Sequence, residues 1–119
     1  MMLERPAVRL LVWKAGAIRC AAPLDALREV VPAGGITPIP GAPEPVRGLA
    51  NIRGHVVTVI DGRALVGAPA ADPPPYLVLV RVGGRTLALG VDEVEDLVAD
   101  PADARRLDLE GLLAPLFPE

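Results

Sequence analysis

The side chain best suited to molecular recognition in this chain is Arg53, which stands between Ile52 and Gly54 at an expected turn. A guanidinium group donates several hydrogen bonds in one plane, so it suits a carboxylate or backbone carbonyl groups on a partner. The alternative is an internal salt bridge, for which Asp61 is a candidate. Interfaces favour arginine, but turns also carry solvating charges. The sequence leaves both interpretations open.

The other reactive side chains do not form a catalytic or metal-binding set. His55 is the single histidine, and no Cys, Asp or Glu lies near it at metal-ligand spacing, which favours a surface or strand histidine. Cys20 has no paired histidine motif and lies in an apolar stretch, so we expect an inert buried thiol. The acidic run 92–96 lacks the spacing of a calcium loop and predicts a solvated strand face. We therefore expect no catalytic residue, no metal and no cofactor.

Several glycines are expected to serve the backbone rather than a ligand. Gly48 and Gly54 suit a positive φ or a close approach of strands, and Asn51 can cap the turn through its own backbone. Gly83 and Gly84 suit the positive φ angles of a two-residue hairpin turn. The latter pair lacks the lysine and the strand-to-helix context of a phosphate-binding loop.

The elements that position these residues are mainly short strands. Runs of β-branched and apolar residues, separated by turn residues, predict three hairpins. Their expected strands are 8–15 with 18–21, 46–52 with 55–60, and 76–82 with 85–91. Residues 92–98 alternate polar and apolar side chains, which is typical of an edge strand.

The intervening segments are less regular. Residues 23–31 place apolar side chains at helical spacing between two prolines, although Val30 and Val31 equally suit the start of a strand. Residues 38–45 are too rich in proline to form a regular element. Residues 64–66 predict a brief apolar turn, and the composition of residues 67–75 predicts a linker.

The composition of the chain excludes several classes of protein and of partner. The chain has 119 residues, of which 51% are hydrophobic and 23% charged, so it is one compact module rather than a disordered tail. The 14 prolines and 12 glycines favour many short elements. A net charge of −3, no basic block and 3% aromatic residues argue against nucleic acid as a partner. The start of the chain resembles neither a signal peptide nor a membrane span, and one cysteine fits a reducing cytoplasm.

Residues 46–63 closely resemble the signature of CheW-like domains, the coupling modules of bacterial chemotaxis. In that family a Gly-x-x-Asn-apolar-Arg-Gly turn, here residues 48–54 (GLANIRG), precedes a Val-Val-x-Val-Ile-Asp strand, here residues 56–61 (VVTVID). The resemblance continues at 28–31 (REVV), 91–94 (VDEV) and 107–109 (LDL). It therefore spans most of the chain.

The resemblance implies an all-β fold of two small SH3-like antiparallel barrels with short helical segments. We expect one domain over residues 1–119, with residues 16–70 in a first barrel and residues 1–15 plus 71–119 in a second. The chain departs from the family at Thr58, where proline is favoured, and at Gly62, where leucine is favoured. Only residues 99–106 stand where the family inserts another strand and turn, so the second barrel is expected to be shortened. Residues 107–109 correspond to the closing strand, and a terminal helix follows.

The resemblance further implies a non-enzymatic adaptor in the cytoplasm, at receptor arrays through its partners and without membrane insertion. The implied partners are the regulatory domain of a CheA-type histidine kinase and the cytoplasmic helical tip of a chemoreceptor. The expected docking residues are Arg53, Asn51, Val46 and Val57, with many valines of these strands expected in the core. One alternative is a degenerate module that keeps one interface and caps or regulates a signalling assembly. A more remote alternative is a small metabolite-binding or enzymatic β-barrel.

Overall fold

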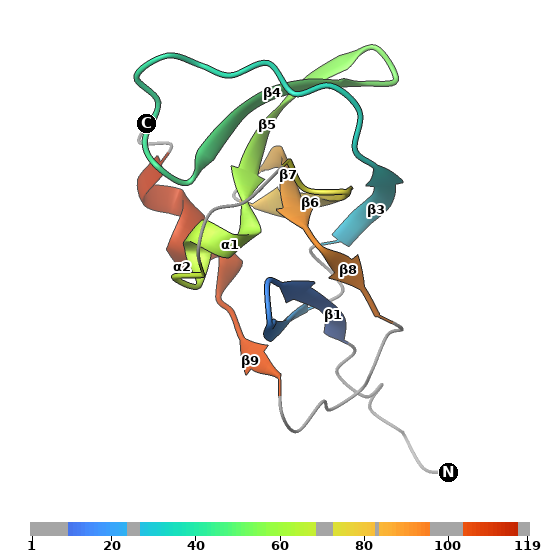
Figure 1. Ribbon diagram of the computed structural model, residues 1–119, viewed down its shortest axis with the longest axis vertical. Coiled ribbons are helices and arrows are strands. Elements are labelled where there is room, and N and C mark those ends of the chain that lie inside the picture. The colour runs from blue at the N-terminus through green and yellow to red at the C-terminus, as the bar shows by residue number, and fades with distance from the viewer. Residues whose placement is uncertain (1–9, 24–26, 69–72, 83, 96–103, 117–119) are drawn as a thin grey trace, which may run out of the picture.

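Strands dominate the molecule and form two sheets, which confirms the all-β fold (Figure 1). The computed structural model describes residues 10–23, 27–68, 73–82, 84–95 and 104–116. No helix among these residues is long and apolar enough to cross a membrane. In chain order the elements are β1 (Leu10–Ala15), β2 (Ile18–Pro23), β3 (Leu27–Pro32), β4 (Val46–Ile52), β5 (His55–Asp61), α1 (Gly62–Leu65), β6 (Tyr76–Val82), β7 (Arg85–Val91), β8 (Glu93–Val94), β9 (Arg105–Arg106), α2 (Leu109–Leu113) and the 3₁₀ helix η2 (Ala114–Leu116).

The smaller sheet has the order β8-β1-β2-β9. Strands β1 and β2 form an antiparallel hairpin that turns at Gly16, whose φ of 63° lies in the region that glycine adopts at little cost. Strand β8 pairs with β1 at Trp13 and Lys14, and β9 runs parallel to β2 at Cys20 and Ala21. Both outer strands have two residues, so they cover only part of the hairpin.

The larger sheet has the order β3-β6-β7-β5-β4. The expected hairpins β4–β5 and β6–β7 are both present, and the second turns at Gly84 with a φ of 78°. Gly83 lies outside the described residues. Strands β5 and β7 are parallel, from the pair Thr58 and Leu87 to the pair Asp61 and Gly90, and this pairing joins the two hairpins into one sheet.

The main hydrophobic core lies between the two sheets, because it takes side chains from both. Trp13 and Cys20 come from the smaller sheet, Leu89 from the larger sheet and Leu113 from α2, and each is at most 1% exposed. Alternating side chains of β6 point to the two faces of the larger sheet, as the two-residue period of a strand requires. Leu113 brings the C-terminal helix onto the same core.

A second, smaller core lies on the other face of the larger sheet. Val59, Leu77 and Ala88 form its centre. Ile36 and Ala33 pack against it from the segment that follows β3. This proline-rich segment is irregular, as its composition predicts, and it covers a face that would otherwise be open.

The same segment brings the two edges of the larger sheet toward each other. Thr37 forms an isolated antiparallel bridge with Leu49 of β4, with both N–H to O distances at 2.8 Å. Gly48 is required there, because its φ is 150° and a Cβ atom would overlap the carbonyl oxygen of Thr37. A backbone connection therefore links the chain that leaves β3 to the opposite edge strand β4.

The hydrogen-bonded sheets divide the chain differently from the expected subdomains. Strands β6 and β7, expected with residues 1–15, pair instead within the larger sheet, and β2 pairs with β1 rather than with the first barrel. The reason is long-range: β7 finds its partner in β5, which sequence neighbours do not reveal.

Four local expectations also differ from the structure. Residues 27–32 form strand β3, so the extended alternative holds there, while residues 24–26 lie outside the described part. The apolar turn after β5 is the short helix α1. Residues 107–109 are not a closing strand, because α2 begins at Leu109. The short exposed strand β9 at Arg105–Arg106, and a short β8 in place of a longer edge strand, flank residues 96–103, which are outside the described part.

Candidate functional site

The β4–β5 turn holds Arg53 in an unusual backbone conformation. Arg53 has a φ of 53° and Gly54 a φ of 85°, so both central residues of this two-residue hairpin turn have positive φ. Such a turn matches the twist of the flanking strands, and its favoured residues are asparagine, aspartate and glycine. The left-handed region costs a residue with a Cβ atom about 1 kcal/mol. Arginine at this position is therefore not explained by turn preference.

Asn51 stabilises this turn from strand β4. Its side-chain Oδ1 accepts a hydrogen bond from the backbone N–H of Gly54 at 2.9 Å. The asparagine side chain thus replaces a backbone acceptor within the turn, as expected from the sequence. Asn51 is itself exposed, beside the turn that presents Arg53.

The Arg53 side chain reaches across to Glu29 on β3, the opposite edge strand of the larger sheet. Its Nη1 donates to Glu29 Oε1 at 2.6 Å, and the guanidinium forms an ion pair with the second carboxylate oxygen. The Arg53 side chain nevertheless remains 68% exposed. Asp61 is not its partner, because Asp61 accepts from Arg47 at 3.3 Å and from the backbone N–H of Arg63 at the start of α1. The suggested Arg53–Asp61 pair is therefore wrong.

Arg53 lies on the wall of an open depression of about 460 Å³. The apolar lining of this depression comes from three strands, and its polar lining comes from Arg53, Glu29, His55 and Thr86. Among the expected docking residues, it brings together Arg53 and Val57. The residues that line it are Glu29, Ile52, Arg53, His55, Val56, Val57, Leu79 and Thr86.

Two expected docking residues lie elsewhere. Val46 begins β4 at the end away from the turn, pairs with Ile60 and packs against the main core. Asn51 is on the exposed face of β4, opposite Val56, which is 65% exposed. Leu49 is exposed on that same face, so the outer surface of the β4–β5 hairpin is partly apolar.

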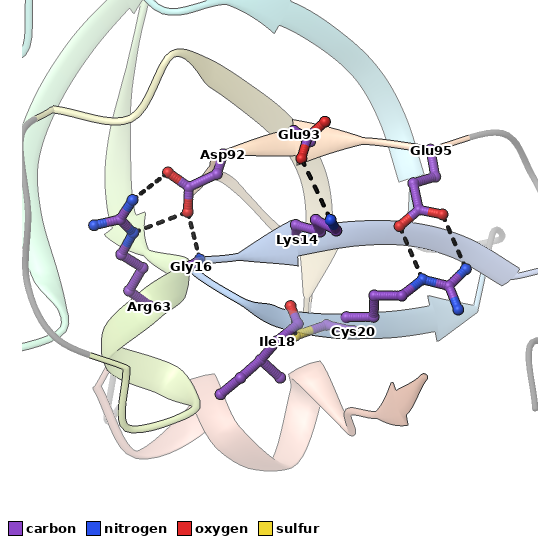
Figure 2. A network of polar contacts seen from close by, with 9 residues as sticks. Lys14, Gly16, Ile18, Cys20, Arg63, Asp92, Glu93 and Glu95 are labelled. Carbon is purple, nitrogen blue, oxygen red and sulfur yellow. Dashed lines mark hydrogen bonds and ion pairs between the residues drawn. The ribbon is translucent and has the colours of Figure 1, made fainter. Parts of the chain in front are cut away.

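A different cluster joins the two sheets around Asp92, which lies between β7 and β8 (Figure 2). Its Oδ2 accepts from Arg63 Nε of α1 at 2.8 Å and from the backbone N–H of Gly16 at 2.5 Å, while its Oδ1 accepts from Arg63 Nη2. The hydrogen bond from Arg63, aided by that from Gly16 and by the guanidinium charge, lowers the pKa of the Asp92 carboxyl against the opposing effect of burial. Asp92 thus connects α1, the β1–β2 turn and the chain between the sheets.

Two more ion pairs hold the region of β8 against the small hairpin. Glu95 accepts from Arg19 Nε and Nη2, each at 2.9 Å, in the paired geometry that guanidinium groups favour. Glu93 lies 3.7 Å from Lys14 Nζ (Figure 2). The acidic run predicted as a solvated face is therefore engaged in cross-strand pairs at these positions, and Asp96 lies outside the described residues.

The remaining reactive groups form no site within the described residues. No group of three His, Cys, Asp or Glu side chains there is placed to hold a metal ion. Cys20 is fully buried, as expected, and burial raises the pKa of its thiol against the opposing positive charge of Arg105. His55 is exposed and lines the depression beside Arg53. The sequence predicts His55 as a surface or strand residue, and Glu29 is not among the expected docking residues, although the REVV motif contains it.

The fold and the β4–β5 turn define the class of protein. The family model of the CheW-like domain matches residues 9–113, and the chain belongs to this family. It is similar to "Chemotaxis protein CheW" of Rhizobium meliloti (strain 1021), with 32% identity over 91 residues that cover 75% of this chain and 59% of that protein.

A solved structure supports the same assignment. The fold is similar to that of the scaffolding protein TtCheW from Thermoanaerobacter tengcongensis, with a TM-score of 0.71 and 25% identity over 78% of this chain and 65% of that chain. The chain thus spans less than two thirds of the length of either relative.

Proposed function

We propose that this protein is a non-enzymatic adaptor that couples chemoreceptors to a CheA-type histidine kinase by docking to both. The observation that carries the proposal is membership of the CheW-like family across residues 9–113, together with the names of its relatives as chemotaxis and scaffolding proteins. A scaffold needs surfaces rather than reactive groups, and the site described above offers a surface. The protein works in the cytoplasm, at receptor arrays that its partners hold together.

Arg53 is the proposed contact with the kinase regulatory domain. It is exposed, it lies beside a depression with apolar walls, and its backbone conformation is one that turn chemistry alone disfavours. Exposed arginine next to a partly apolar surface is the composition typical of interaction hot spots. Val57 lines the same depression, and Asn51 holds the turn that presents Arg53 by accepting a hydrogen bond from Gly54. The receptor's helical tip is the second proposed partner, and it is inferred from the family alone.

Replacing Arg53 with Glu tests the kinase contact. We expect the affinity for the regulatory domain of the CheA-type kinase to fall at least about tenfold. The substitution replaces an attraction between the guanidinium and a carboxylate of the partner with repulsion between two carboxylates. Titration calorimetry measures the change, and circular dichroism verifies that the variant is folded. The matched control is Arg106→Glu, which makes the same charge change on β9. Equal affinity of Arg53→Glu and the unmodified protein would remove Arg53 from the interface.

A second candidate function is that of a module with one interface, which caps or regulates a signalling assembly. The observation that favours it is the reduced outer part of the smaller sheet, where β8 and β9 have two residues each. A pull-down with the kinase regulatory domain and with a receptor-tip fragment separates the two functions. Capture of both fragments together contradicts the one-interface function, and capture of a single fragment contradicts the coupling function.

A further inference from the structure

One end of the larger sheet gathers positive charge. Strands β5 and β7 are parallel and in register from Thr58 and Leu87, so their first residues lie at the same end of the sheet. The turns β4–β5 and β6–β7 both lie at this end. Strand β3 reaches it as well, because Glu29 is in register with Leu79 of β6. We call this end, with Arg53, His55 and Arg81, the basic end.

Among the described residues of the basic end, exposed arginine outnumbers carboxylate. Arg53 and Arg81 are both exposed there, and Glu29 forms its ion pair with Arg53. In the described strands β3 to β7 the other acidic residue is Asp61, which lies at the far end of β5 with Arg47. The whole chain carries a net charge of −3, so this positive end departs from the chain as a whole. Such a local excess attracts partners of opposite charge.

The depression at the basic end also has an apolar floor. Val57 and Leu79 are 9% and 8% exposed, and both belong to the second core cluster. Arg81 pairs in register with Thr86, and strand alternation places both on the same face as Leu79. Arg81 therefore lies on the side of the sheet where the floor is open, and Arg53, His55 and Thr86 line the depression there.

We propose that the basic end binds an acidic segment of a partner protein, with an apolar side chain in the depression between flanking carboxylates. This inference rests on the proposed docking function, and it adds the chemistry of the partner and the residues Arg81 and His55. Carboxylates of the segment meet Arg53 and Arg81, where guanidinium groups form directed, charge-assisted hydrogen bonds. The apolar side chain covers Val57 and Leu79. Charge determines which segments bind, and apolar burial holds them.

A protein segment fits this surface better than nucleic acid or an anionic membrane. Binding to single-stranded nucleic acid uses aromatic side chains for base stacking, and the chain's single tyrosine, Tyr76, lies at the opposite end of β6. Membrane binding uses a wide basic surface, whereas Glu29 sits beside Arg53 within this one. A concave floor with few charges is suited to one side chain and its neighbours.

A short acidic peptide tests the inference without the kinase. The probe is acetyl-Glu-Glu-Leu-Glu-Glu-amide, with the same peptide carrying glutamine in place of glutamate as the control. We expect the acidic peptide to shift the backbone amide resonances of Arg53, His55, Arg81 and Thr86 in the ¹⁵N-labelled protein, and the glutamine peptide to shift them little. No shifts at these residues, or equal shifts with both peptides, would overturn the inference and leave the calorimetric test of the proposed function intact.

Charge reversal at Arg81 tests the same surface in the protein itself. Arg81→Glu is expected to lower the affinity for the acidic peptide and for the kinase regulatory domain roughly fivefold. Arg106→Glu, which gives the same net charge, should leave both affinities unchanged. Arg81→Gln, which only neutralises the charge, should give an intermediate loss. Equal losses for the Arg81 and Arg106 variants would attribute the effect to net charge and contradict the inference. Co-sedimentation with phosphatidylserine vesicles that depends on Arg81, without peptide binding, would assign the surface to a membrane instead.

Discussion

Two arginine–carboxylate pairs in this molecule have the same chemistry and different surroundings. Arg63 and Asp92 are 23% and 22% exposed, and their carboxylate also binds the backbone of Gly16. Arg53 is 68% exposed, and its pair with Glu29 is open to solvent on one side. The first pair joins three separate segments at the junction of the two sheets. The second pair joins Glu29 on the edge strand β3 to Arg53 in the turn after the opposite edge strand, β4.

The comparison separates a pair that stabilises the fold from a pair that is free to exchange partners. Charge-assisted hydrogen bonds sheltered from water contribute about 1.5–3 kcal/mol each, whereas exposed ion pairs contribute about 0–1 kcal/mol. An exposed arginine can leave Glu29 for a partner's carboxylate at little cost. The junction around Asp92 has no such freedom, since Arg63 and Gly16 share one carboxyl group.

The largest effect is expected from Asp92→Asn. The amide keeps the shape of the side chain but loses the charge that Arg63 and Gly16 bind, so the free energy of unfolding should fall by about 2–3 kcal/mol. Urea unfolding monitored by circular dichroism measures it. Glu93→Gln is the matched control, because its pair with Lys14 is 3.7 Å long and largely exposed, and its effect should be within about 0.5 kcal/mol. Equal effects of the two substitutions would contradict the distinction between the pairs.

The same carboxyl group predicts how stability depends on pH. The pKa of Asp92 is lowered in the folded state, chiefly by its hydrogen bond from Arg63, so the unfolded chain takes up the proton first as the pH falls. The stabilisation is complete above the unfolded pKa of about 3.9 and is lost as the pH falls below it through the lower folded value. Between about pH 6 and pH 3, the free energy of unfolding should therefore fall less steeply with falling pH for Asp92→Asn than for the unmodified protein. Parallel pH profiles would argue against this contribution.

A smaller effect of opposite sign is expected from Arg53→Asn. Asparagine adopts positive φ more readily than arginine, and the Asn-Gly pair is favoured in this turn. We expect the free energy of unfolding to stay level or rise by up to about 1 kcal/mol while affinity for the kinase regulatory domain falls. Measuring both in the Glu29→Gln background removes the ion pair from the comparison. A clear loss of stability in that background would show that arginine serves the turn itself.

The smallest effect is expected from Glu29→Gln. The pair it forms with Arg53 is exposed, so the free energy of unfolding should change by less than about 1 kcal/mol. The substitution also removes the carboxylate that competes for Arg53, so the acidic peptide should bind more tightly. Chemical denaturation and peptide titration by NMR measure the two quantities. Weaker peptide binding would mean that Glu29 orients Arg53 for its partner rather than competing with it.

Local turn chemistry accounts for the part of the fold that the sequence predicts well. The hairpins that turn at Gly16, Gly54 and Gly84 form as expected, because apolar strands and glycine at the turn specify them within about fifteen residues. The assembly of hairpins into sheets is different. The parallel pairs β5 with β7 and β2 with β9 join distant segments, and no local pattern encodes them.

The sequence likewise predicts the candidate site only where its contacts are local. Arg53 is recognisable from its motif, and the positive φ at its turn follows from Gly54 beside it. Its partner Glu29 lies 24 positions away, and Asp92 meets Gly16 across 76 positions. Such partners depend on how the sheets fold together. His55 and Arg81 join the site for the same reason, since the parallel arrangement of β5 and β7 brings their turns to one end.

The hairpin of β1 and β2 has a consequence for synthesis of the protein on the ribosome. The strands that flank it, β8 and β9, come from residues 93–94 and 105–106, so they are made roughly eighty residues later. At about 5–20 residues per second, the nascent hairpin waits roughly 4 to 16 seconds with both edges unpaired. Unpaired edges of apolar strands readily associate with other chains. We therefore expect a lower growth temperature, or a chaperone that shields nascent chains, to raise the yield of folded protein. Either should raise it more than any substitution near the β4–β5 turn.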